Sequence, residues 1–192
     1  MVPASLFIPD SFESARLIFR PPHPDEAADI NTAVCESIDR LRPWMIWAQR
    51  PPTLEESRRF AGEAHAKFLA RQELSLQMRR KSDSLLVGMT GFHDIDWTVP
   101  KLEIGYWART NYTGQGYITE AVHCLTRLAF EILNANRVEI RMDDRNEKSW
   151  RVAERAGFPL EGILRNDERA PTGELRDTRI YAKVRLIDGS IG

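Results

Sequence analysis

A mixed α/β fold is predicted by three features of the sequence. An alternating apolar strand at 102–107 runs through a glycine-containing turn into a segment with helical spacing. A second alternating strand, at 137–142, is again followed by a helical segment. Antiparallel hairpins are expected near both ends, with turns at 94–100 and 171–173. Strands that alternate with helices and also form hairpins are typical of one mixed sheet.

In the N-terminal half, prolines and capping residues indicate where elements begin and end. A short strand at 16–20 is followed by two prolines, which cannot extend a central strand. The helix expected at 24–34 carries acidic residues in its first turn, where they suit the helix dipole. The proline- and tryptophan-rich segment 41–52 is expected to be a structured loop or a short helical turn. Thr53, with Glu56 three residues later, forms a capping box that begins the next helix.

In the C-terminal half, glycines mark the limits of two helices. Gly116 precedes apolar residues at Ile118, Ala121, Val122 and further on, which is helical spacing. Gly157 is expected at position C′, immediately after the helix over 147–156. The remaining expected elements are strands at 75–80, 85–93, 101–107, about 160–167 and about 176–186, and helices from Thr53 to about 71 and from Gly116 to about 133.

Composition limits the classes of function. A chain of 192 residues with 42% hydrophobic and 29% charged side chains is expected to form a single domain over 1–192, with 1–13 as a loose N-terminal arm. A net charge of −1 favours neither nucleic acid nor an anionic membrane as a partner. Because the sequence has neither a long apolar span nor a signal-peptide pattern, a cytoplasmic protein is expected.

The turn after the strand at 102–107 has the features of a phosphate-binding loop. Gly114 and Gly116 allow positive φ and leave backbone N–H groups uncovered, and a helix that begins there directs its positive dipole end into the turn. A P-loop requires a lysine after its second glycine, but Tyr117 stands there. The dinucleotide fingerprint requires a third glycine where this chain has Thr119.

Four ordered motifs resemble the GNAT N-acetyltransferases, in particular their RimJ/RimL-like branch, which acetylates ribosomal proteins. The turn resembles the family's pyrophosphate loop, Gln/Arg-x-x-Gly-x-Gly/Ala, although Asn111 replaces the first Gln or Arg. The other three motifs are the opening strand Ala15–Pro22, the substrate-side loop Leu41–Trp47, and the Asn-x-x-Ser element from Asn146 to Phe158 with the following Leu160–Arg165. The resemblance covers residues 12 to 186 and implies a twisted, mostly antiparallel sheet of about seven strands with about four helices, splayed between its fourth and fifth strands.

The resemblance implies that acetyl-CoA is the acyl donor. In the family, pantetheine lies in the splay and bonds backbone groups of the strand before the loop, which also supplies the oxyanion donor. The implied donor-binding residues are Ile104, Gly105, Tyr106 and Trp107 on the strand, Tyr112, Thr113, Gly114, Gln115, Gly116, Tyr117, Ile118 and Thr119 in the loop, and Asn146 and Ser149 at the start of the following helix.

The resemblance also implies which groups move protons. Ser149 would protonate the leaving thiolate, because no tyrosine occurs between Tyr117 and Tyr181 to act instead. Asn146 would bond the pantetheine amide, although its residue type also suits a plain helix cap. Glu168 matches the position of the base in this branch. The alternatives left open are Glu103 on the central strand and a water molecule relayed by Asp94 or Asp96.

The acceptor side is less defined. Trp44 and Trp47 lie in the substrate-side loop, where they either wall the amine site or plug the core beneath it. His93 is either a substrate-side group or an ordinary turn residue. No group of His, Cys and carboxylate side chains has metal-ligand spacing, so no metal is expected. The acceptor is expected to be a protein N-terminal amine, alternatively a polyamine, an amino acid derivative or an aminoglycoside, and the protein a monomer or homodimer. A non-catalytic acyl-CoA-binding domain is the remaining alternative.

Overall fold

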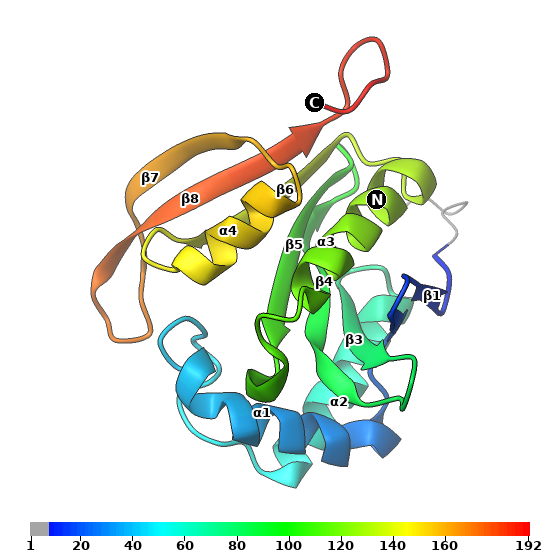
Figure 1. The fold of residues 1–192 in the computed structure, drawn as a ribbon, viewed down its shortest axis with the longest axis vertical. Helices are drawn as coiled ribbons and strands as arrows, with labels where there is room; N and C mark the ends of the chain where they lie inside the picture. The colour runs from blue at the N-terminus through cyan, green and yellow to red at the C-terminus, as the bar shows by residue number, and fades with distance from the viewer. Residues whose placement is uncertain (1–7) are drawn as a thin grey trace.

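An eight-stranded mixed sheet forms the centre of the protein in the computed structural model, which describes residues 8–192 (Figure 1). The spatial order is β1-β2-β3-β4-β5-β6-β8-β7, and every neighbouring pair is antiparallel except β5 and β6. The strands are β1 (Phe12–Glu13), β2 (Leu17–Arg20), β3 (Leu74–Arg80), β4 (Leu86–Asp96), β5 (Lys101–Ala108), β6 (Arg137–Asp143), β7 (Leu160–Arg169) and β8 (Leu175–Val184).

The strand absent from the sequence prediction is β1, which lies in the expected loose arm. Phe12 pairs with Phe19 of β2, and the two rings stack with centroids 5.0 Å apart. The apolar contact holds this segment against the sheet, so the expectation of a loose arm is wrong for residues 12 and 13. Residues 1–7 of that arm lie outside the described part of the chain.

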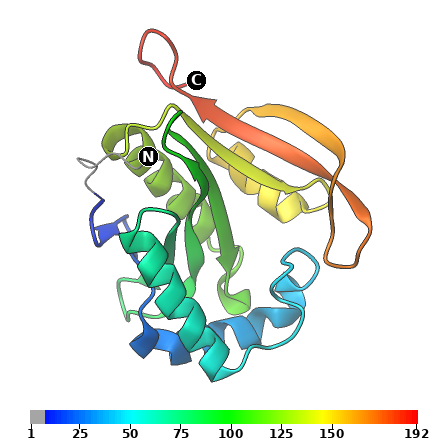
Figure 2. The same ribbon diagram turned by 180° about the vertical axis from the view of Figure 1, so that it is seen from behind.

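Helices cover both faces of the sheet (Figures 1 and 2). The cluster containing Leu76, Ile104 and Leu125 lies on the face covered by α3 and α4, whereas Ile30, Ala61 and Met89 belong to a second cluster with α1 and α2. The helices are α1 (Ala27–Leu41), α2 (Leu54–Leu69), α3 (Tyr117–Arg127) and α4 (Glu147–Arg155), with short 3-10 turns at Pro24–Glu26 and Thr110–Tyr112 and a π turn at Leu128–Ile132. Among the described residues, none of these helices combines the length and the apolar character that crossing a membrane requires.

Local signals placed most helix ends. The capping box is present, because Thr53 accepts from the Glu56 N–H and Glu56 accepts from the Thr53 N–H. Gly157 has φ +73° directly after α4, as a C′ residue should. The segment expected as a helix at 24–34 begins as a 3-10 turn and its α-helix continues to Leu41. The α-helix after the glycine loop ends at Arg127 and passes into the π turn, earlier than expected.

The sheet opens between β5 and β6. These parallel strands pair only from Lys101 to Glu103 with Arg137 to Glu139, so the rest of β5 has no partner on that side. The expected splay is therefore present at the position that the sequence indicated. On the other side, β5 pairs with β4 along its full length, and β4 continues to Asp96 into the segment expected as a turn.

Candidate active site

A cleft of about 1060 Å³ lies between the two halves of the sheet. One wall is the loop joining α1 to α2, and the opposite wall is the hairpin of β7 and β8, whose tip approaches this loop in both views (Figures 1 and 2). The floor is formed by β4, β5 and β6. Predicted residues from five separate segments line the cleft, namely Trp44, Trp47, His93, Glu103, Asn146, Ser149 and Glu168.

Alternation along β5 separates two faces at the splay. Leu102 and Ile104 are buried in the cluster beneath α3 and α4, and Tyr106 packs against that cluster. Trp107 packs against the other cluster, near α1. Glu103, Gly105 and Trp107 therefore lie on the face with the α1–α2 loop, and a group that passes through the splay beside Ile104 to Trp107 reaches both faces.

The glycine loop offers a set of uncovered backbone donors. Within the described part of the chain, the N–H groups of residues 114 to 119 have no protein acceptor, and the first one to be bonded is that of Glu120, which donates to the Gly116 carbonyl. Gly114 and Gly116 have φ of +74° and +80°. The loop thus presents N–H groups and a helix N-terminus together, which fits a pyrophosphate. The Tyr117 side chain is buried beneath Arg16, so only its backbone faces the loop.

Asn146 and Ser149 lie together at the start of α4. The Asn146 side-chain oxygen accepts from the Ser149 N–H at 3.3 Å, so Asn146 is an N-cap, as its residue type suggests. In the described chain its amide N–H₂ has no protein acceptor and remains available to a ligand in the cleft. The two readings of Asn146 are therefore compatible.

The structure adds Tyr106 to this group. Its hydroxyl lies 3.1 Å from Ser149 Oγ and 3.0 Å from the Ser149 carbonyl oxygen. Burial raises the pKa of Tyr106 to about 12, so the phenol is protonated at neutral pH. The expectation from sequence concerned tyrosines that follow the glycine loop, whereas Tyr106 precedes the loop and is brought to Ser149 by the packing of α4 against β5. The alternating pattern of β5 already indicated that Tyr106 shares a face with Leu102 and Ile104, which is the face beneath α4.

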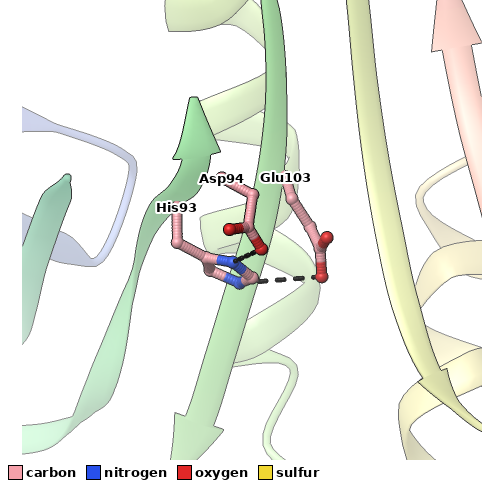
Figure 3. Close-up of side chains that lie close together, drawn as sticks. All are labelled: His93, Asp94 and Glu103. Carbon is pink, nitrogen blue, oxygen red and sulfur yellow. Dashed lines mark hydrogen bonds and ion pairs between the residues drawn. The ribbon is translucent and has the colours of Figure 1, made fainter. Parts of the chain in front are cut away.

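Glu103 lies beside His93 on the face of β5 that carries the α1–α2 loop, which is called the acceptor face below (Figure 3). The two residues are directly opposite each other in the β4–β5 ladder, with His93 Nε2 3.7 Å from Glu103 Oε1. Burial raises the pKa of Glu103 to about 7, although the nearby His93 opposes this shift. Asp94 Oδ2 is 3.2 Å from His93 Nδ1. One polar atom from each of the three side chains lies within 4.8 Å of the others, a proximity that sequence spacing did not reveal.

Glu168 and the tryptophans lie on the two walls of the cleft. Glu168 is about half exposed and pairs with Arg176 of β8, so a cation already neutralises its charge. Trp47 is 54% exposed and its ring centroid is 6.2 Å from that of Trp107. Trp47 therefore walls the cleft rather than plugging the core, and Trp44 lines the same wall.

Residues 16–159, well over half of the chain, match the family model for the acetyltransferase (GNAT) domain. The chain belongs to the GNAT acetyltransferase family. This acetyltransferase is 34% identical over 146 residues to YdaF of Bacillus subtilis (strain 168), whose name carries a provisional assignment as a ribosomal N-acetyltransferase; the match covers 74% of this chain and 78% of YdaF. It is 28% identical over 151 residues to the ribosomal-protein-serine acetyltransferase of Escherichia coli (strain K12), covering 79% and 83% of the two chains.

Solved structures of acetyltransferases have a fold similar to that of this chain. The microcin C7 self-immunity acetyltransferase MccE, in complex with acetyl-CoA and AMP, has a TM-score of 0.86 and 25% identity, covering 92% of this acetyltransferase and 97% of MccE. RimL, the ribosomal L7/L12 α-N-protein acetyltransferase, in complex with coenzyme A, has a TM-score of 0.83 at 22% identity, covering 95% and 99%, which indicates a shared fold. This acetyltransferase is thus an enzyme that uses acetyl-CoA as its acyl donor.

Proposed function

We propose that this acetyltransferase transfers the acetyl group to a protein N-terminal α-amine, which enters through the cleft. The observation that carries this proposal is the cleft itself. It reaches from an open mouth to Glu103 on the acceptor face of β5, beside the splay between β5 and β6. The relatives named for ribosomal-protein substrates support the same acceptor class.

The residues on the two faces have complementary roles in this reaction. The N–H groups of 114 to 119 hold the pyrophosphate of acetyl-CoA, and the free amide of Asn146 bonds its pantetheine arm. The hydroxyls of Ser149 and Tyr106 are placed to pass a proton to the departing sulfur. On the acceptor face, Glu103 takes the proton that the amine loses when it attacks.

Proton affinities favour an α-amine over a lysine. An α-ammonium has a pKa of about 7.7–8.0, and roughly a tenth of it is neutral at pH 7. A lysine ammonium, with a pKa near 10.4, is neutral less than a thousandth of the time. A carboxylate whose pKa is about 7 can accept a proton from the first amine at little cost but is a poor match for the second.

A polyamine or aminoglycoside is the second candidate, but the charges of the cleft do not favour it. Such a polycation needs several unpaired carboxylates. Most of the described carboxylates that line this cleft already have basic partners, and among them only Glu103 and Asp94, beside His93, have no Arg or Lys partner. The paired carboxylates are Glu56 with Arg50, Glu73 with Lys67, Glu139 with Lys101 and Arg137, Asp143 with Arg145, and Glu168 with Arg176.

An acceptor panel tests this assignment. Short peptides with a free N-terminus should be acetylated, and the same peptides with a blocked N-terminus and an internal lysine should react at least about 100-fold more slowly at pH 7, from the ratio of neutral amine. Thiol release and mass spectrometry would measure the rate and the site. Faster turnover of spermidine or an aminoglycoside than of every peptide would replace the proposed acceptor class.

Loss of the hydroxyl pair should slow turnover without weakening donor binding. Ser149→Ala is expected to lower kcat by about tenfold to 100-fold, which is at or below the low end of general acid catalysis, because a thiolate leaves readily. Tyr106→Phe should cause a smaller loss, and the double variant little more than Ser149→Ala alone, because the two hydroxyls act as one unit. Equal turnover of Ser149→Ala and the wild type, with the chemical step limiting, would discard this role.

A further inference from the structure

We propose that His93 carries the proton from Glu103 to solvent and thereby returns the base to its charged form after each turnover. This inference rests on the proposed function, in which Glu103 accepts the proton of the amine. It assigns a catalytic role to a side chain that the sequence placed only on the substrate side.

Exposure increases in steps from Glu103 outward. The Glu103 side chain is 12% exposed, His93 is 39% exposed and Asp94 is 79% exposed. A carboxyl group this enclosed exchanges its proton slowly unless a second group links it to water. The three side chains form a compact group in Figure 3, in which the imidazole ring contacts both carboxylates.

Each ring nitrogen of His93 has a different carboxylate as its partner. Nε2 lies 3.7 Å from Glu103 Oε1, and Nδ1 lies 3.2 Å from Asp94 Oδ2. An imidazole can therefore accept a proton at one nitrogen and release another at the other, which is how histidine acts as a shuttle. In balance, the amine gives H⁺ to Glu103, Glu103 gives H⁺ to Nε2 once their 3.7 Å separation shortens to hydrogen-bond distance, and Nδ1 gives its H⁺ to water at the exposed end beside Asp94. The neutral ring, left protonated at Nε2, regains the Nδ1–H form by proton exchange with water before the next turnover.

Gly105 provides the space in which this ring lies. A Cβ at position 105 would be 2.7 Å from His93 Nε2 and 2.9 Å from its Cδ2. The backbone of Gly105 has no left-handed φ that would itself require glycine. The absence of a side chain at 105 therefore serves the imidazole, which lies across β5 next to Glu103.

The surrounding charges favour a transient imidazolium. Three carboxylates surround the ring, namely Asp94 on β4, Glu103 on β5 and Glu73 just before β3, whose carboxylate also senses His93. On the far side of Glu103, the groups of β6 are Arg141, which lowers the pKa of Glu103, and Glu139, which raises it. Lys67 pairs with Glu73, but the two groups nearest the ring nitrogens, Glu103 and Asp94, are both carboxylates.

Buffer dependence provides the main test. His93→Ala is expected to lose on the order of tenfold in kcat at low buffer concentration, less than the 100-fold or more typical for losing the base itself. Adding imidazole or more buffer should restore most of the rate, because a dissolved base then replaces the ring. Acetyl-CoA affinity by calorimetry should stay unchanged. The matched control is His23→Ala, which removes another histidine 3.2 Å from an aspartate but away from the cleft, and should keep both the rate and its buffer independence.

The pH profile provides an independent readout. Without the imidazole, which lowers the pKa of Glu103, the acidic limb of kcat/KM should move to higher pH. Gly105→Ala retains His93 but pushes its ring away from Glu103, and it should move the acidic limb in the same direction. A wild-type rate of His93→Ala at low buffer, or a loss that imidazole does not restore, would overturn the relay. Full activity of Glu103→Gln would instead show that Glu103 is not the base. Failure of the proposed function can therefore be told apart from failure of the relay.

Discussion

Glu103→Gln is expected to lower kcat/KM by about 100-fold or more, the usual loss for a general base, while acetyl-CoA affinity stays unchanged. The glutamine keeps the shape of the side chain but cannot accept the proton. The residual rate should rise with pH as more acceptor amine becomes neutral, without the acidic limb near pH 7 that Glu103 gives the wild type. Steady-state kinetics over pH 6 to 9, with calorimetry for the donor, would measure both effects.

Glu168→Gln is the necessary comparison, because the resemblance implies that Glu168 stands at the position of the base. Glu168 is about half exposed on the wall of the cleft and already pairs with Arg176, so it suits a hydrogen-bond contact with the entering acceptor better than removal of its proton. We therefore expect its loss to raise KM for the acceptor more than it lowers kcat. If Glu168→Gln abolished the acidic limb and Glu103→Gln retained it, the two roles would have to be exchanged.

The same Glu103→Gln change should stabilise the protein at alkaline pH. The usual pKa of the carboxyl is 4.5, and in the folded state it is about 7. Between these values the folded state holds a proton that the unfolded state has lost, so the free energy of unfolding falls as pH rises through this range. The difference corresponds to about 3 kcal/mol at most. Thermal unfolding should show equal stability of the two proteins below pH 4.5 and a more stable variant at pH 8.

Gly116→Val is expected to reduce acetyl-CoA affinity by about 100-fold, equivalent to losing one or two charge-assisted hydrogen bonds. Gly116 has φ +80° at the start of α3, where a valine is strained, and its new Cβ would lie 3.4 Å from Arg16 Nη2, in the loop that carries the uncovered N–H groups. Calorimetry on the folded variant would measure the change.

Gly173→Val is the control that separates backbone strain from obstruction of the pyrophosphate loop. Gly173 has φ +92° and open space around its Cα, but it lies in the turn between β7 and β8, away from the loop. It should lose stability by a similar backbone strain and keep its affinity for acetyl-CoA. Unchanged affinity in Gly116→Val would remove the pyrophosphate from this loop.

Local patterns predicted those parts of the molecule that depend on neighbouring residues. The Thr53 capping box, the Gly157 helix end and the strand–glycine–helix turn all depend on contacts within a few positions, and all are present. The splay, in contrast, was implied by the resemblance to the GNAT family rather than by a local pattern. Residues 12 and 13 escaped prediction because a two-residue strand has no period to detect.

Long-range packing determined the parts that could not be predicted. The contact of Tyr106 with Ser149 joins positions 43 apart in sequence and exists only because α4 packs beside β5. The pairing of His93 with Glu103 depends on the register of β4 and β5, which shifts between His93 and Asp96. A hairpin pattern alone does not fix such a register, so the grouping of Glu103, His93 and Asp94 is visible only in the structure.

The short pairing of β5 with β6 has a consequence for how the donor is held. Beyond Glu103, β5 has a strand edge without a sheet partner, and an extended polar ligand can occupy this gap as an additional strand would. Main-chain groups would then provide much of the attraction, and they are identical whatever side chain is attached. We therefore expect sequence changes along this edge of β5 to be tolerated, because recognition depends on the separation of the β5 and β6 backbones rather than on residue identity.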